Sequence, residues 1–103
     1  MLYAITLTYV RPKDEVQAHL DSHRQWLADE VTAGRILAAG PLESGAGGFI
    51  LAFAQDRGEI DAMIRRDSFH VHGLATFDVQ AFSAAIRAEA FPTVWAGDAR
   101  AIR

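Results

Sequence analysis

Histidine is the side chain best suited to moving protons near neutral pH, and this sequence carries four of them in two close pairs. His19 and His23 are four residues apart, which is one helical turn, whereas His70 and His72 are two apart and share a face only if extended. Such pairs can ligate a metal ion, but the acidic residues that usually accompany a metal site are missing. We therefore predict no metal site. For His19, His70 and His72 the competing interpretation is polarity at the surface or at a pocket edge.

His23 differs from the other three because it completes an apolar helix stripe. Position 23 falls on the same predicted helix face as Val16, Leu20, Leu27 and Val31. A buried imidazole needs a partner for its ring N–H. A carboxylate at one ring nitrogen would fix the tautomer and leave the other nitrogen free as a base. A backbone carbonyl would satisfy the ring passively, so helix phase alone leaves both interpretations open.

Asp67 is the candidate carboxylate. It follows "MIRR" at the end of a second predicted helix, where the chain turns toward the last predicted strand. If both helices cover one face of a sheet, positions 23 and 67 approach each other. The alternative for Asp67 is a turn residue that accepts a hydrogen bond from its own backbone.

Side chains near these two positions are candidates for holding a substrate. Arg24, Arg65 and Arg66 are suited to an anion, and solvated helix surface is the competing interpretation for each. Three aromatic residues are candidates for lining an apolar pocket, with core packing as the alternative: Trp26, Phe49 and Phe69.

Composition and motifs exclude several other kinds of function. The 103 residues suit one domain, half of them are hydrophobic, and the net charge of −3 with no basic cluster argues against nucleic-acid binding. There is no cysteine, and neither Ser22 nor Ser44 lies in a G-x-S-x-G motif. The "GAGG" stretch lacks the lysine and the following helix of a phosphate loop. With no signal peptide and no membrane-length apolar run, we predict a cytoplasmic protein without a cofactor.

The elements that must position these residues follow from periodicity. Strands are predicted at 2–10, 35–42, 49–54 and 74–82. A first helix of about 20 residues begins near Pro12 and ends at Gly34. A second helix spans roughly 57–66, with Asp56 as its N-cap and Glu59 three residues further on. The stretch "DSFHVHG" interrupts the pattern before the last strand.

The order β-α-β-β-α-β predicts a ferredoxin-like α+β fold, a four-stranded antiparallel sheet with two helices on one face. The face without helices also carries apolar residues, and monomers rarely leave such a face in water, so we predict a homodimer. Residues 85–103 form an extension that is too apolar for a free tail. We expect it to pack on its own core or on the partner subunit.

The order and spacing of several motifs resemble the YciI-like (YCII-related) family over about residues 1–83. The resemblance lies in His23 within "H-x-x-x-L", then "GRILAAGPL", then a glycine-rich hairpin, then "IRRDSFHVHGLATFDVQAF". It implies the fold of the dimeric α/β barrel proteins and a pocket histidine–aspartate pair, which here falls on His23 and Asp67. Ser68 stands where the family often has proline, so the rigidity of this turn is in question. One type of member is linked to dehydrochlorination of a chlorinated hydroxyquinol.

These inferences combine into one functional prediction. Residues 1–84 form a YCII-related domain in which the pair catalyses acid–base chemistry, as an isomerase or a dehydrochlorinase-like lyase, on a small cyclic or enolic substrate. The alternative is a non-catalytic module for small-molecule binding or oligomerisation. We predict no nucleic-acid or membrane partner. The predicted substrate-binding residues are Arg24, Gly40, Pro41, Phe69 and His70.

Overall fold

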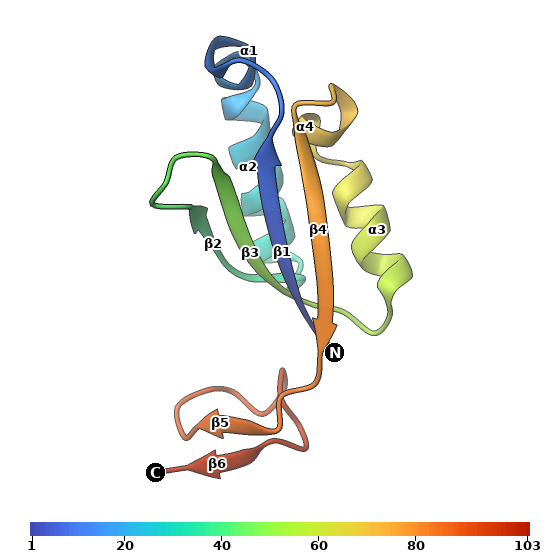
Figure 1. Ribbon diagram of the computed structural model, residues 1–103. Coiled ribbons are helices and arrows are strands. Elements are labelled where there is room, and N and C mark those ends of the chain that lie inside the picture. Colours follow the sequence, from blue (N-terminus) through green and yellow to red (C-terminus); the bar gives the residue numbers. More distant parts are fainter.

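The computed structural model describes residues 1–103, and its main body is a four-stranded antiparallel sheet (Figure 1). The strands β1 (Leu2–Tyr9), β2 (Ile36–Pro41), β3 (Gly47–Phe53) and β4 (Ala75–Phe82) lie in the order β2-β3-β1-β4. Consecutive β2 and β3 form a hairpin, and the helical connections place β1 in the interior of the sheet next to β4. This is the predicted ferredoxin-like α+β fold.

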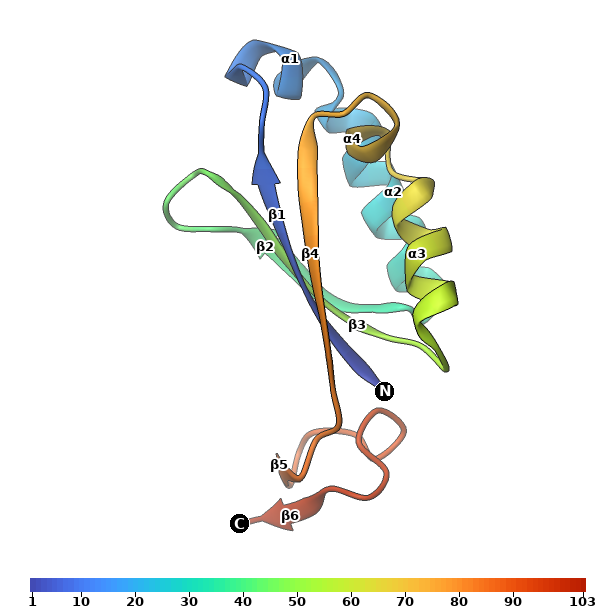
Figure 2. The same cartoon turned by 45° about the vertical axis from the view of Figure 1, so that its right-hand side comes forward.

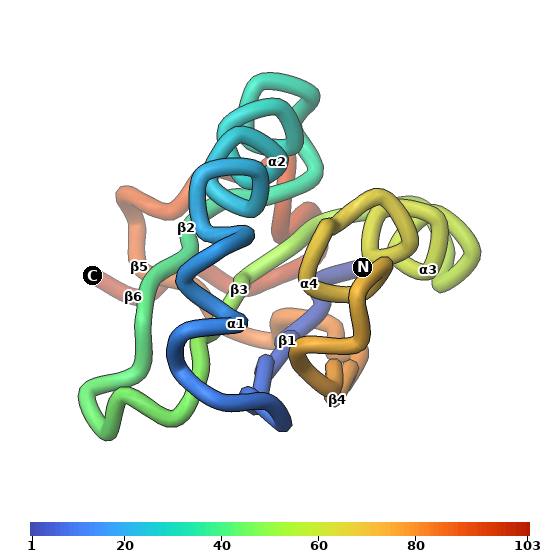
Figure 3. Tube along the Cα trace, turned by 90° about the horizontal axis from the view of Figure 1, so that it is seen from above, coloured from blue at the N-terminus to red at the C-terminus, as the bar shows by residue number.

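The helices lie on one face of this sheet and leave the other face open (Figures 2 and 3). Along β1 the residues alternate, so that Tyr3, Ile5 and Leu7 point toward the helices and are almost fully buried. Ile5 lies opposite Ile50 of β3 and Val79 of β4, which makes one continuous apolar row across three strands. The core therefore sits between this sheet face and the helices.

The first predicted helix is in fact two helices. α1 (Lys13–Ala18) and α2 (Leu20–Thr32) meet at His19, whose φ of −114° and ψ of 12° depart from helical values. The backbone N–H of His19 bonds the Val16 carbonyl, three residues back, so the chain tightens into a short turn there. The sequence pattern did not reveal this break.

The predicted stripe holds at Val16, Leu20, His23 and Leu27, which are buried or pack against the core, and is wrong at Val31. Val31 is 51% exposed, and the buried residues of α2 are His23, Trp26 and Glu30. Glu30 is buried because two guanidinium groups pair with it, Arg35 at 2.6 Å and Arg66 at 2.7 Å. The buried Glu30 carboxylate therefore joins the end of α2 to the start of β2 and to the end of α3 (Arg57–Arg65).

Two aspartates cap the helices of the second crossover. Asp56 accepts the backbone N–H of Glu59 at 3.1 Å, which confirms its predicted role at the start of α3. Where the sequence pattern was interrupted, the structure has the short helix α4 (Ser68–Val71), capped by Asp67. None of the helices is both long enough and apolar enough to cross a membrane.

Residues 85–103, which we call the arm, follow β4 beyond the end of the sheet (Figures 1 and 2). Two short parallel strands, β5 (Ile86–Ala88) and β6 (Arg100–Ile102), pair within it. What the arm packs against in solution stays a prediction.

Gly47 provides a direct test of the β1–β3 contact. A Cβ atom at position 47 would lie 1.7 Å from the backbone carbonyl oxygen of Leu7, so the two strands would have to separate. We expect Gly47→Ala to lower the free energy of unfolding by about 2–3 kcal/mol through this overpacking. Gly40→Ala is the matched control, because a Cβ at position 40 meets nothing within 4 Å. Urea unfolding of both variants measures the difference, and equal stabilities would contradict the register of these strands.

Candidate active site

His23 and Asp67 are in direct contact, although 44 residues separate them in the sequence. His23 Nδ1 lies 2.8 Å from Asp67 Oδ1. The Asp67 side chain is fully buried, and that of His23 is 11% exposed. The helix phase of α2 points the imidazole at the start of α4, and the N-cap position of Asp67 presents its carboxylate to the imidazole.

The same carboxylate oxygen also caps α4, because Asp67 Oδ1 accepts the backbone N–H of Phe69 at 3.1 Å. Asp67 is therefore both a partner of His23 and a residue that bonds its own backbone, so the two interpretations of its role apply together. A carboxylate oxygen accepts, so the ring nitrogen that faces it, Nδ1, donates, and in the neutral imidazole the lone pair is then at Nε2. The other oxygen, Oδ2, is buried and has no hydrogen-bond partner.

Aromatic rings hold the imidazole in place. Phe69 stacks on His23 with ring centroids 3.8 Å apart and an interplanar angle of 1°. Trp26 lies 5.6 Å from the imidazole centroid and donates its indole N–H to the Met63 carbonyl oxygen. Tyr9 meets Phe69 edge-on, with ring centroids 5.9 Å apart. With one edge bonded and one face stacked, the imidazole has a fixed orientation.

Ser68 is tied to α2 by its side chain. The hydroxyl oxygens of Ser22 and Ser68 lie 2.7 Å apart. Both hydroxyls are within hydrogen-bond distance of the His19 carbonyl oxygen, at 2.9 and 3.4 Å. The turn that carries Asp67 is thus joined to the helix that carries His23 by a second contact, within the first turn of α2.

A cavity of about 140 Å³ opens beside His23, between α2 and the sheet. Its lining brings together several of the residues predicted from the sequence, since Arg24, Gly40 and Pro41 are among them. The remaining lining residues are mostly apolar: Leu7, Tyr9, Leu20, Leu27, Ala39, Gly48, Phe49 and Ile50.

Other predicted residues lie elsewhere. Phe69 is fully buried and contacts His23 rather than the cavity. His70 is exposed, outside the lining, with its ring 6.0 Å from Phe77. His19 and His72 stack on each other at 4.0 Å, also outside the lining. No three His, Asp or Glu side chains are grouped in a way that would hold a metal ion.

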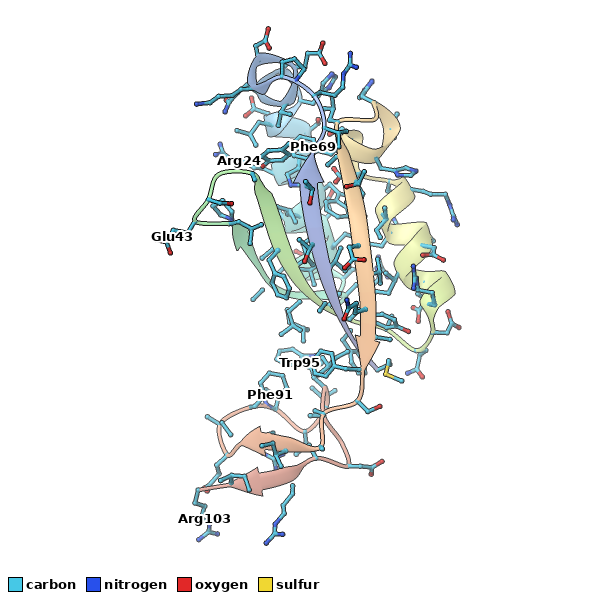
Figure 4. The ribbon with its side chains drawn as sticks, viewed as in Figure 1. Arg24, Glu43, Phe69, Phe91, Trp95 and Arg103 are labelled. Carbon is cyan, nitrogen blue, oxygen red and sulfur yellow. The ribbon has the colours of Figure 1, made fainter.

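Tyr9 is a lining residue that the sequence analysis missed. It ends β1, on the face shared by Tyr3, Ile5 and Leu7, so strand alternation was the signal that could have placed it toward α2. With His23 and Arg24 it makes up the titratable groups of the cavity wall. Figure 4 shows Arg24 and Phe69 at the end of the sheet that lies far from the arm.

The Asp67 contact should determine the tautomer of His23. In Asp67→Ala the buried acceptor is lost, so we expect the imidazole proton to move from Nδ1 to Nε2, the position preferred by free histidine. Asp67→Asn is the control, because its side-chain carbonyl can still accept from both Phe69 N–H and His23 Nδ1–H. The ring ¹⁵N chemical shifts of the neutral imidazole measure this difference. Identical shifts in wild type and Asp67→Ala would show that another group holds the Nδ1 proton.

Comparisons with known proteins agree with this fold. The structure resembles 5-chloro-2-hydroxyhydroquinone dehydrochlorinase (TftG) from Burkholderia phenoliruptrix AC1100, solved as a complex with 2,5-dihydroxybenzoquinone. The two chains share 20% sequence identity at a TM-score of 0.68, over 82% of this chain and 95% of that one. None of the curated proteins matches the sequence. The YCII-related domain matches residues 1–83, which include both His23 and Asp67. The chain therefore belongs to the YCII-related family.

Proposed function

We propose that this protein is a small enzyme in which His23 transfers a proton to or from a ring-shaped substrate while Asp67 holds the imidazole. The observation that carries the proposal is the buried Nδ1–Oδ1 contact of 2.8 Å at the wall of a cavity. A histidine that served only to fill the core would need no cavity beside it and no buried carboxylate behind it.

The contact leaves Nε2 as the proton acceptor. With its proton on Nδ1, the neutral ring has its lone pair at Nε2, on the edge away from Asp67. As Nε2 takes a proton, the ring becomes positively charged, and the Asp67 carboxylate stabilises that charge at 2.8 Å. Return of the proton to another atom of the substrate gives an isomerisation, whereas departure of a leaving group such as chloride gives an elimination.

The cavity supports a substrate of one ring. An apolar cavity of about 150 Å³ holds benzene in another protein, and this one is about 140 Å³. Arg24 at the rim suits an anionic oxygen, and the Tyr9 side chain adds a phenol group among apolar neighbours. The dehydrochlorinase that shares the fold is named for a substrate of this size, a chlorinated hydroxylated ring.

The energetics of the pair also favour a functional role. Asp67 keeps one buried oxygen without a partner, and leaving a buried acceptor unpaired costs about 1–3 kcal/mol. Buried ion pairs are often no more stabilising than apolar residues of similar volume. A residue pair selected only for stability would more simply be apolar.

Removing the proposed base should abolish turnover. We expect His23→Gln to lower kcat at least about 100-fold, the usual scale of a general base. His72→Gln is the matched control, because His72 is exposed and lies outside the cavity. Turnover is measured with chlorinated hydroxyquinols, lactones and enol acids. Equal activity of the wild type and His23→Gln would refute the catalytic proposal. If none of these compounds is turned over but one of them raises the melting temperature of the wild type and not of His23→Gln, the non-catalytic binding function replaces it.

Arg24 should contribute to binding more than to chemistry. For an anionic substrate we expect Arg24→Gln to raise KM about tenfold while kcat changes little, because the guanidinium would contact a group remote from the reacting atoms. Arg65→Gln is the control, since Arg65 is also exposed but lies on α3, outside the lining. Steady-state kinetics separate the two constants. Equal KM values for Arg24→Gln and Arg65→Gln would mean that Arg24 does not bind the anionic group of the substrate.

A further inference from the structure

Tyr9 is a polar group of the cavity to which the proton transfer by His23 assigns no role. It ends β1 on the strand face that turns toward the helices, and it lines the cavity together with His23 and Arg24. The other lining residues are aliphatic residues, one phenylalanine, one proline and glycines. The polar side chains that a bound ring can meet in this cavity are therefore one imidazole, one guanidinium and one phenol.

The hydroxyl of Tyr9 has no hydrogen-bond partner within the chain, although its backbone is bonded. The buried side-chain atoms that lack a partner are Asp67 Oδ2 and Arg87 Nε, so the Tyr9 hydroxyl is not sealed in the core. Its ring packs against the core, whereas its hydroxyl is open to solvent or to a bound molecule. A tyrosine arranged in this way offers a free hydrogen-bond donor at the end of an apolar side chain.

Two kinds of contact hold this donor in position. The backbone N–H of Tyr9 donates to the Ala46 carbonyl oxygen at 2.9 Å, and Tyr9 pairs with Ala75 of β4 in the sheet. The Tyr9 ring meets Phe69 edge-on at 5.9 Å, and Phe69 stacks on the imidazole of His23 at 3.8 Å. One buried ring thus contacts both the phenol and the proposed base. The phenol is therefore held in place before any ligand arrives, as electrostatic catalysis requires.

Removal of a proton from carbon creates a charge that needs such a donor. When His23 Nε2 takes the proton of a C–H bond next to a ring carbonyl, the electron pair of that bond forms a C=C bond and the carbonyl oxygen becomes an enolate oxyanion. In a mostly apolar cavity this charge is costly unless a hydrogen bond meets it. The enolate then collapses, either by taking the proton back at a different carbon or by expelling a leaving group from the neighbouring carbon with its electron pair.

We propose that the Tyr9 hydroxyl is the donor that binds this oxyanion, so that the cavity takes six-membered rings that carry a carbonyl or an enol. This role rests on the proposed function of His23. Tyr9 keeps its proton throughout, because it donates a hydrogen bond and transfers nothing. Arg24 is less suited to this oxygen, because it follows His23 directly on α2, about 100° further around the helix axis, and is exposed.

Pentafluorophenolate tests the oxyanion site without turnover. It is a benzene-sized ring whose oxygen is ionised at neutral pH, and pentafluorobenzene is the same ring without the oxygen. We expect Tyr9→Phe to weaken pentafluorophenolate binding at least about tenfold, the scale of one hydrogen bond to a charged group, and to leave pentafluorobenzene binding unchanged. Tyr3→Phe is the matched control, because Tyr3 lies on the same face of β1 but outside the lining. ¹⁹F NMR titration measures each dissociation constant.

Several results of this titration would overturn the assignment. Wild-type protein that binds pentafluorophenolate no more tightly than pentafluorobenzene has no oxyanion site. If Tyr9→Phe weakens both ligands equally, the phenol only shapes the cavity, and if it weakens neither, Tyr9 does not bind the oxygen. A loss of pentafluorophenolate binding in Arg24→Gln instead of Tyr9→Phe assigns the oxygen to the guanidinium.

Kinetics distinguish this proposal from the assignment of His23 as the base. On a compound that the wild type turns over, we expect Tyr9→Phe to lower kcat about 100-fold with little change in KM, as the loss of one oxyanion donor does. Unchanged kcat in Tyr9→Phe overturns the role of Tyr9 in the reaction. If His23→Gln keeps its activity while Tyr9→Phe loses both turnover and pentafluorophenolate binding, the base is another group and the oxyanion site stands.

Discussion

A fully buried carboxylate can keep its charge only where protein donors replace water, and Asp67 meets two of them at a single oxygen. One donor is the backbone of α4 and the other is the imidazole of His23 on α2. The position of Asp67 therefore depends on both helices being in place, and the orientation of His23 depends on Asp67. The cavity, the tautomer and the proposed chemistry all follow from this contact.

Three contacts at successive residues keep α2 beside the segment that carries Asp67. Glu30 bonds Arg66, His23 bonds Asp67, and Ser22 bonds Ser68. The ion pair at Glu30 joins a half-exposed guanidinium to a buried carboxylate. Its effect is positional, because it holds Arg66, the residue directly before Asp67. The side-chain contact of Ser68 supplies a restraint that a proline would otherwise have supplied through its backbone.

The two ends of the sheet serve different purposes. At one end the helices and the strands enclose the cavity, and the apolar row through Ile5 and Ile50 forms the core beside it. At the other end β4 continues into the arm, which adds length without adding to the core. The cavity wall that carries Arg24 therefore lies at the end of the sheet away from the arm (Figure 4).

The sequence by itself determined the four strands of the main sheet, the helical crossovers between them and their order, because alternation along a strand and spacing along a helix depend on neighbouring residues. It also marked His23 as a polar residue in an apolar stripe, and "RRDSF" offered a carboxylate. The tertiary structure alone decided that the first helix breaks at His19, that Glu30 is buried while Val31 is exposed, and that His70 lies outside the cavity. The physical reason is that the partners of a buried charge are distant in sequence. Glu30 finds Arg66, and His23 finds Asp67, only once the helices pack side by side on the sheet.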